Sequence, residues 1–175
     1  KNVFPSYSVK VQNMRIYNNA RIDRVLYYAA SVFAYAGGPL QDVFEVATKD
    51  MGVSQNVKIF DTEAGFLATQ VDGVNIIFGS SQNLQSRGLE IPEGALRDDV
   101  DLSDELSIMY MFRENKLVAK MYIKYVMDSD IDLILKQFSG SGLYVCVRTF
   151  DPNIDEAMIA KKAGMKKMPL KIVRY

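Results

Sequence analysis

The dipeptide Asp72-Gly73 separates two apolar runs, Phe66 to Val71 and Val74 to Phe78. Asp-Gly is well suited to join two antiparallel strands, because both of its residues tolerate the positive φ that a two-residue turn requires. Apolar runs on either side of such a turn are typical of strands that pair with each other. This segment predicts a β-hairpin and places the chain among proteins that contain an antiparallel sheet.

Other apolar runs extend this sheet on both sides of the hairpin. Val57 to Phe60 precedes it. The runs Leu106 to Phe112 and Leu117 to Val126 follow it and flank the polar segment Arg113 to Lys116. A few polar residues between two strand-like runs again indicate a hairpin. We therefore expect an antiparallel sheet from Val57 to Val126.

The residues before the sheet have helical periodicity. Apolar side chains recur every three or four positions, at Ile22, Val25, Leu26, Ala29, Ala30 and Phe33. This spacing places them on one face of a helix. A second helix is expected from Pro39 to Met51, because proline favours the first turn of a helix and Gly52 stops it. We expect the two helices to form a pair on one face of the sheet.

The residues after the sheet alternate between helical and strand-like patterns. Asp130 to Phe138 has helical periodicity, Leu143 to Arg148 is a further β run, and Asp155 to Ala163 predicts one more helix. Together with the run that ends at Val126, this order is typical of a partial Rossmann-like βαβα unit with a right-handed crossover. The fold class is therefore α/β, more strictly α+β: an antiparallel sheet with a helix pair on one face, followed by this unit.

Three further segments complete the expected fold. The chain opens with an extended segment, Phe4 to Gln12. A short helix is expected at Gln82 to Ser86, with a serine cap before it and Gly88 after it. The acidic segment Glu90 to Glu105 is expected to be a surface loop. We divide the chain into two regions, residues 9–120 and residues 121–175.

The composition disfavours several classes of partner. Basic and acidic residues each number 21, and neither sign forms a run. Nothing in the sequence therefore favours binding to nucleic acid or to an anionic membrane. No stretch approaches the ~20 apolar residues that a membrane helix needs. This region is expected to be soluble and not to insert into a membrane.

Residue types argue against metal binding and Ser-His catalysis. The chain has no histidine and one cysteine, whereas histidine is the commonest general base and metal ligand. Cys146 lies in an apolar β run and is expected to be a small buried side chain rather than a nucleophile. Alternation of Met109, Met111, Met121 and Met127 within predicted strands indicates packing rather than soft-metal binding. We expect no bound metal and no catalytic residue in this region.

The end of the first helix carries a family resemblance. The stretch Ala29-Ala-Ser-Val-Phe-Ala-Tyr-Ala-Gly-Gly-Pro-Leu40 resembles the segment of metal-pumping P-type ATPases in which an Ala-Ala-Ser helix runs into Ser-Glu-His-Pro-Leu. Pro39 and Leu40 match. Gly37 and Gly38 stand where the family has the Glu and His that hold adenine. Two glycines before a proline also suit an ordinary turn.

A second segment, Phe60 to Gly73, resembles the family's Gly-x-Gly-Val motif and the hairpin after it. Gly65 matches the second glycine, and Glu63 replaces the first. Glycines there let the backbone approach the nucleotide, which a side chain would obstruct, and a carboxylate would repel the phosphates. Gly79-Ser80 resembles the Gly-Asn that opens the family's next helix. A strand bulge and a helix start explain Gly65 and Gly79 equally well.

The last matching segment is Arg148-Thr-Phe-Asp151, which resembles the Thr-Gly-Asp motif of the phosphorylation domain. Thr149 and Asp151 remain, and Phe150 replaces the glycine. Ligands of open α/β sheets bind at this carboxyl edge of the strands, yet the same two residues could simply cap the following helix. The phosphorylated segment Asp-Lys-Thr-Gly-Thr and the magnesium motif Gly-Asp-Gly-x-Asn-Asp do not occur in the sequence.

In order and spacing, these segments resemble two domains of a heavy-metal or cation P-type ATPase. Residues 9–120 resemble its cytosolic nucleotide-binding domain, and residues 121–175 resemble part of its phosphorylation (haloacid-dehalogenase-like) domain. The resemblance implies that the remnant nucleotide-binding residues are Gly37, Gly38, Gly65 and Gly79, and that the phosphorylation-domain remnants are Thr149 and Asp151. It implies ATP with magnesium as a ligand whose binding is weakened or lost, and no catalysis by this fragment alone.

The resemblance also implies a place at the cytoplasmic face of a membrane. There the region would work in cis with the membrane and actuator portions of its parent protein. The alternative is a pseudo-ATPase module that does not bind nucleotide and serves regulation or protein interaction.

Overall fold

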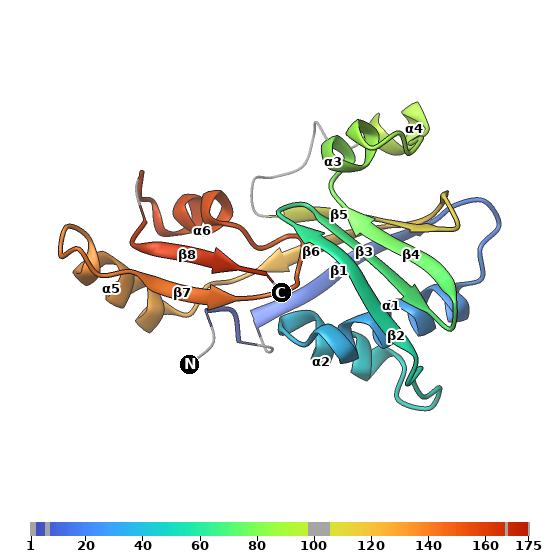
Figure 1. Cartoon of the computed structure of the whole chain (residues 1–175), viewed down its shortest axis with the longest axis horizontal. Helices are drawn as coiled ribbons and strands as arrows, with labels where there is room; N and C mark the ends of the chain where they lie inside the picture. Colours follow the sequence, from blue (N-terminus) through green and yellow to red (C-terminus); the bar gives the residue numbers. More distant parts are fainter. Residues whose placement is uncertain (1–2, 6–7, 98–105, 167, 175) are drawn as a thin grey trace.

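A six-stranded antiparallel sheet forms the centre of the molecule (Figure 1). The computed structural model describes residues 3–5, 8–97, 106–166 and 168–174. In the order of the sheet, the strands are β1 (Val9–Ile16), β6 (Lys116–Tyr125), β5 (Leu106–Arg113), β4 (Val74–Gly79), β3 (Phe66–Val71) and β2 (Val57–Glu63). All neighbouring pairs are antiparallel. The predicted sheet is confirmed, and the opening extended segment supplies its edge strand β1.

The two hairpin turns have the backbone conformation that their sequences favour. Asp72, with φ 53°, and Gly73, with φ 80°, connect β3 to β4. Glu114, with φ 48°, and Asn115, with φ 65°, connect β5 to β6. Two consecutive positive φ values are characteristic of the type I′ turn, whose twist matches that of the paired strands. Both predicted hairpins are confirmed.

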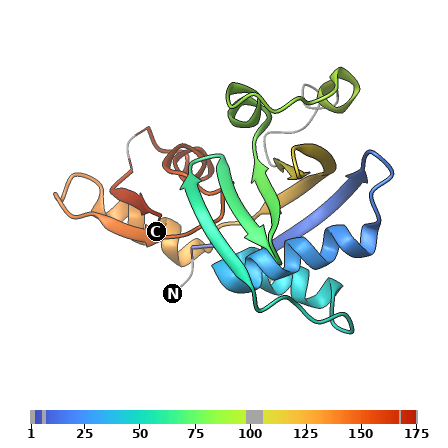
Figure 2. The same ribbon diagram turned by 45° about the vertical axis from the view of Figure 1, so that its right-hand side comes forward.

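The helix pair covers one face of the sheet, as predicted (Figure 2). α1 (Ile22–Ala36) contacts α2 (Pro39–Ala47) and also lies against β2 and β3. Pro39 occupies the first turn of α2, and the helix ends at Ala47, before the predicted end at Met51. The amphipathic spacing of α1 thus places its apolar face on the sheet.

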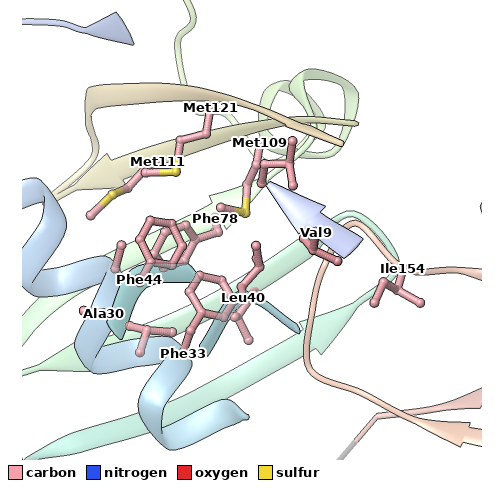
Figure 3. Packing of buried hydrophobic residues seen from close by; sticks show 14 of the residues in the cluster. Val9, Ala30, Phe33, Leu40, Phe44, Phe78, Met109, Met111, Met121 and Ile154 are labelled. Atoms are coloured by element: carbon pink, nitrogen blue, oxygen red, sulfur yellow. The ribbon is translucent and has the colours of Figure 1, made fainter. Parts of the chain in front are cut away.

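The main core lies between the helix pair and the sheet (Figure 3). The ring of Phe33 stacks on that of Phe44 with centroids 5.6 Å apart. The same ring lies 5.1 Å from that of Phe78 on β4. The sheet contributes three fully buried methionines, Met109, Met111 and Met121. These methionines pack in the core, as the sequence predicts.

Two short helices, α3 (Ser81–Ser86) and α4 (Glu93–Leu96), lie over the other face of the sheet (Figures 1 and 2). The apolar residues on this side form a second, smaller cluster: Phe66, Leu84, Ile91, Ala95, Tyr110, Phe112 and Leu117. The hydroxyl of Ser80 accepts a hydrogen bond from the N–H of Asn83, which confirms the predicted cap of α3. The prediction of a loop over Glu90 to Glu105 is wrong for residues 93–96. These residues form α4, whose Ala95 is buried in this cluster. Residues 98–105 lie outside the described residues.

The remaining elements are α5 (Ser129–Phe138), β7 (Val145–Arg148), α6 (Glu156–Ala163) and β8 (Leu170–Val173). The predicted order of strand, helix, strand and helix is confirmed as β6, α5, β7 and α6. β7 and β8 form a separate two-stranded parallel sheet. β8 was not predicted, and the prediction that β6 and β7 form one βαβα unit with a right-handed crossover is wrong, because the two strands lie in different sheets. Both edges of β6 are already hydrogen-bonded, to β1 and to β5, so the parallel partner of β7 is β8.

This arrangement bears on two expectations from the sequence. The boundary between residues 120 and 121 falls inside β6, and the division into 9–120 and 121–175 stays a prediction. Cys146 is exposed, so the prediction that it is buried is wrong. Side chains alternate along a strand, and it is the neighbours Val145 and Val147 that pack against the core.

Candidate functional site

Gly37 and Gly38 form the connection between α1 and α2. Their φ values are positive, 73° and 87°. The N–H of Gly37 donates to the carbonyl of Phe33 at 2.9 Å and closes the last turn of α1. A Cβ atom at either glycine would meet nothing within 4 Å. Larger residues are therefore disfavoured by backbone conformation rather than by lack of space, and a turn accounts for this glycine pair.

Gly65 and Gly79 lie against each other at one end of the sheet. Gly65, with φ 76°, turns the chain between β2 and β3. A Cβ atom on Gly79 would lie 2.4 Å from the carbonyl oxygen of Gly65, and one on Gly65 would lie 2.4 Å from Nδ2 of Asn83. The N–H of Ser80 donates to the carbonyl of Gly65 at 3.0 Å. The close approach that these glycines permit is thus a contact between two backbone segments of this chain, the Gly65 turn and Gly79-Ser80.

The amide of Gly65 is bonded to a distant part of the sequence. Its N–H donates to the carbonyl of Pro152 at 2.8 Å. Pro152 directly follows Asp151, so the segment that resembles the phosphorylation motif lies against the segment that resembles the nucleotide motif. In anion-binding loops such N–H groups face the ligand. Here the donor is satisfied by the protein's own backbone.

Glu63, which stands where the motif has its first glycine, has a partner within the protein. Its Oε2 accepts a hydrogen bond from Nη2 of Arg87 at 2.5 Å. The guanidinium carbon of Arg87 also lies 3.7 Å from the centre of the Phe66 ring. An ion pair of this chain therefore lies beside the Gly65 turn, at the position where the family motif has a glycine without a side chain.

Thr149 and Asp151 follow β7 and are 9% and 1% exposed. The N–H of Asp151 donates to Oγ1 of Thr149 at 3.0 Å. The carboxylate of Asp151 accepts hydrogen bonds from the hydroxyl of Tyr125 at 2.7 Å and from the N–H of Asn153 at 2.9 Å. Nη1 of Arg174 donates to the carbonyl of Asp151 at 2.9 Å. Asp151 thus joins the end of β6 to the segments that follow β7 and β8.

The electrostatics of this group follow from its burial. Withdrawal from water raises the pKa of Asp151 from 3.8 to about 6, although hydrogen bonds from Tyr125 and Asn153 oppose the change. Burial, followed by the charge of Asp151, raises the pKa of Tyr125 well above its ordinary value. Thr149 and Asp151 do not cap the next helix: Asp155 does, and its carboxylate accepts from the N–H of Met158 at 2.7 Å. Asp151 is a buried link between elements.

Two cavities contain residues that the sequence singled out. One of about 280 Å³ is lined by Gly38 and Thr149 together with Phe4, Pro39, Arg148 and Ile154. One of about 690 Å³ lies beside the end of α1 and is lined by Tyr35, Phe60, Arg148, Phe150 and Arg174. Gly65 and Gly79 line neither of these cavities. The structure brings Gly38 close to Thr149, and Gly65 close to Gly79 and Pro152, in two separate places.

The partners of Asp151 were missed by the sequence analysis. Tyr125 ends an apolar run, where a buried hydroxyl needs a hydrogen-bond partner, and this was a usable signal. Asn153 and Arg174 gave no signal, because they reach Asp151 only in the folded chain. The ion pair of Glu63 with Arg87 likewise depends on the packing of α3 against the β2–β3 turn.

Across 3–5, 8–97, 106–166 and 168–174, no three His, Cys, Asp or Glu side chains are placed to hold a metal ion. No helix of those ranges is long and apolar enough to cross a membrane.

The fold is shared with part of a solved transporter. The crystal structure of a zinc-transporting PIB-type ATPase in the E2.Pi state matches with a TM-score of 0.50 and 14% identity, over 98% of this chain and 27% of that one. The resemblance inferred from the sequence is therefore confirmed at the level of the fold. No protein-family model and no curated protein matches the sequence.

Two smaller structures match at similar identity. The N-domain of a copper-transporting P-type ATPase, HMA6, has a TM-score of 0.49 and 14% identity, over 67% of this chain and 99% of that domain. The catalytic domain of a CPx-ATPase, CopB-B, has a TM-score of 0.47 and 13% identity, over 98% of this chain and 57% of that one.

Proposed function

We propose that this chain is the nucleotide-binding region of a cation-transporting P-type ATPase-like membrane protein whose ATP site has degenerated. It lies at the cytoplasmic face of the membrane and works in cis with the membrane and actuator portions of the parent protein. The fold shared with a zinc-transporting PIB-type ATPase and the ordered motif remnants from Gly37 to Asp151 support this function. The chain spans 27% of that transporter, so transport and phosphorylation are assigned to other segments of the parent.

The hydrogen bond from Gly65 to Pro152 is the observation that carries the proposal. The resemblance places the approach of the backbone to the nucleotide at Gly65, yet its N–H donates to Pro152 at 2.8 Å. A ligand that accepted this N–H would leave the carbonyl of the buried residue Pro152 without its donor. A buried polar group left unpaired costs about 1–3 kcal/mol. At the other remnant, Gly37 and Gly38 offer no side chain to adenine. ATP binding is therefore weak or lost, and the fragment alone hydrolyses nothing.

The test is a titration of the chain with ATP and with AMP-PNP, followed by backbone amide chemical shifts. We expect no saturating shifts at the amides of Gly38, Gly65 and Gly79 up to millimolar nucleotide. Micromolar affinity with shifts at these three amides would contradict the degenerate site.

A repaired variant makes the test sharper. Gly37→Glu, Gly38→His and Glu63→Gly together restore the family's side chains. Each lost charged hydrogen-bond partner removes about 1.5–3 kcal/mol, so two correspond to roughly a hundredfold or more in affinity. The variant should bind ATP more tightly than the native chain, although both positions combine a positive φ with a ψ of −164° or −172°. Non-glycine residues rarely adopt this conformation, and it costs about 1–3 kcal/mol in stability at each position.

The matched control carries Gly37→Ala, Gly38→Ala and Glu63→Gly. It has the same backbone strain and the same loss of the carboxylate, but no groups that hold adenine. Tighter binding by the repaired variant than by this control supports the proposal. Equal binding by both would contradict it.

The alternative function is a pseudo-ATPase module for regulation or protein interaction. The bond from Gly65 to Pro152 favours it as well, because a turn occupied by its own chain presents a protein surface rather than a nucleotide site. If neither the native chain nor the repaired variant binds ATP, this module becomes the better description.

A further inference from the structure

A separate concave site lies at the start of α1, away from the Gly37-Gly38 end. A cavity of about 340 Å³ is formed there by the start of α1, the link before it and the β5–β6 hairpin. Four cationic side chains line it: Arg21, Arg24, Arg113 and Lys116. No acidic residue of the described chain lines it, although basic and acidic residues each number 21 in the whole sequence. The fold concentrates positive charge that the sequence distributes over two distant segments.

Arg113 and Lys116 are directly opposed across the β5–β6 hairpin. The Cβ atoms of opposed residues lie roughly 4.5–5.5 Å apart, and like charges in such a pair are destabilising. Glu114 lies between them in the turn. Its carboxylate, however, accepts hydrogen bonds from the backbone N–H of Asn75 at 2.9 Å and from its side chain at 3.3 Å. The free protein therefore keeps a repulsive cationic pair at the rim of the cavity.

Arg24 brings a further guanidinium to the same place through Tyr28. Its Nη2 donates to the hydroxyl of Tyr28 at 2.9 Å, and its Cζ lies 5.0 Å from the centre of that ring. Cζ of Arg113 lies 5.9 Å from the same ring centre. Tyr28 is 3% exposed, so a buried ring holds both cations at the cavity wall.

Two nearby carboxylates already have hydrogen-bond donors, and one of them is paired with a cation that lines the cavity. Asp23 accepts two hydrogen bonds from Arg21, at 2.7 and 3.1 Å. Asp72 accepts hydrogen bonds from the hydroxyls of Tyr27 at 2.6 Å and of Ser54 at 2.5 Å. Asp23 also accepts a hydrogen bond from the backbone N–H of Arg24 at 3.0 Å. Within the part of the chain that the structure describes, however, no carboxylate is hydrogen-bonded to the charged groups of Arg24, Arg113 and Lys116.

We propose that this cavity binds a phosphate group, carried by a small phosphorylated molecule or by a lipid headgroup. A dianionic phosphate accepts hydrogen bonds from several cations at once, and its oxygens match the fork of a guanidinium. Its binding also removes the repulsion between Arg113 and Lys116. A cavity of about 340 Å³ is within the range of small-molecule sites. The inference does not depend on the degenerate ATP site, which involves other residues.

The experiment has three arms at constant ionic strength: inorganic phosphate, glycerol 3-phosphate, and vesicles that contain phosphatidic acid. Amide shifts of Arg113 and Lys116 report on the soluble ligands, and co-sedimentation reports on the vesicles. We expect saturable binding in at least one arm. Binding of the soluble ligands alone identifies a small phosphorylated molecule, and binding of vesicles alone identifies a lipid headgroup. The absence of binding in all three arms would overturn the proposal.

Charge-removing variants test whether the binding belongs to this cavity. Arg113→Gln and Lys116→Gln should each weaken it roughly tenfold or more, because each removes a charged hydrogen bond. Lys171→Gln is the matched control, since it removes the same charge from β8 on the far side of the molecule (Figure 1). An equal loss in the control would mean non-specific attraction and would overturn the proposal.

The free protein gives a second, independent readout. Without phosphate and at low ionic strength, Arg113→Gln and Lys116→Gln should raise the melting temperature, because each removes a like-charge repulsion. Added salt should reduce this gain by screening. Two variants that melt below the wild-type protein would contradict the repulsion on which the proposal rests.

Discussion

Asp151 carries a carboxyl group that is almost completely buried in the folded protein. Only 1% of it is exposed, and its carboxylate accepts hydrogen bonds from Tyr125 and Asn153. Burial of an ionised carboxyl group is unfavourable, which is why its pKa rises to about 6. At the residue scale, the role that the structure gives Asp151 is a link between β6 and the segment after β7.

Asp151→Asn should therefore remove a pH dependence of stability. On folding, the pKa of Asp151 rises from 3.8 to about 6, so the folded protein binds this proton more tightly than the unfolded chain. The contribution of Asp151 to the free energy of unfolding then falls as pH rises through that interval, by roughly 3 kcal/mol at ~1.4 kcal/mol per pKa unit. Above the interval this contribution no longer changes with pH.

Urea unfolding of both proteins at several pH values measures this effect. The variant serves as the reference, because all other carboxyl groups are common to the two proteins. The difference in stability, wild type minus variant, should decrease from acidic to neutral pH. Parallel pH profiles would contradict the raised pKa.

At the scale of elements, the β2–β3 turn, the end of β4 and the start of α3 are held together by backbone contacts. The carbonyl of Gly65 accepts from Ser80, and its N–H donates to Pro152. Neither bond involves a side chain. The packing of these elements therefore depends on Gly79, where a Cβ atom would meet the backbone of Gly65, and on Gly65, where a Cβ atom would displace the side chain of Asn83.

Gly79→Ala should destabilise the protein by about 1–3 kcal/mol, the usual cost of overpacking. Its Cβ atom would lie 2.4 Å from the carbonyl oxygen of Gly65, so the backbone has to move. Gly94→Ala in α4 is the control, because a Cβ atom there meets nothing within 4 Å and alanine favours a helix. Equilibrium unfolding in urea compares them, and an equal effect of both substitutions would argue against the close contact.

At the scale of the whole molecule, the parts that could be predicted are those with local causes. The turn at Asp72-Gly73 depends on the φ values of two adjacent residues, and α1 depends on a spacing of three and four. Both are written within a few positions of sequence. The central sheet and its helix pair were accordingly predicted, and the edge strand β1 overlaps the extended segment predicted from Phe4 to Gln12.

The parts that could not be predicted depend on contacts between distant segments. β1 and β5 occupy the two edges of β6, so β7 cannot pair with β6 and pairs with β8 instead. The cationic cavity joins Arg24 to Arg113 through the burial of Tyr28. No pattern within a short window encodes either arrangement, and charge counted along the sequence gave no sign of the cavity.

The proposed function requires that the carbonyl of Pro152 takes up the N–H of Gly65, in the turn where the resemblance places ATP. Hydrogen exchange at the amide of Gly65 tests it most directly, because this N–H donates to the carbonyl of Pro152 at 2.8 Å. We expect the Gly65 amide to exchange slowly in the free protein and its rate to stay unchanged when millimolar ATP with magnesium is added. Rapid exchange in the free protein, or additional protection by ATP, would contradict the claim.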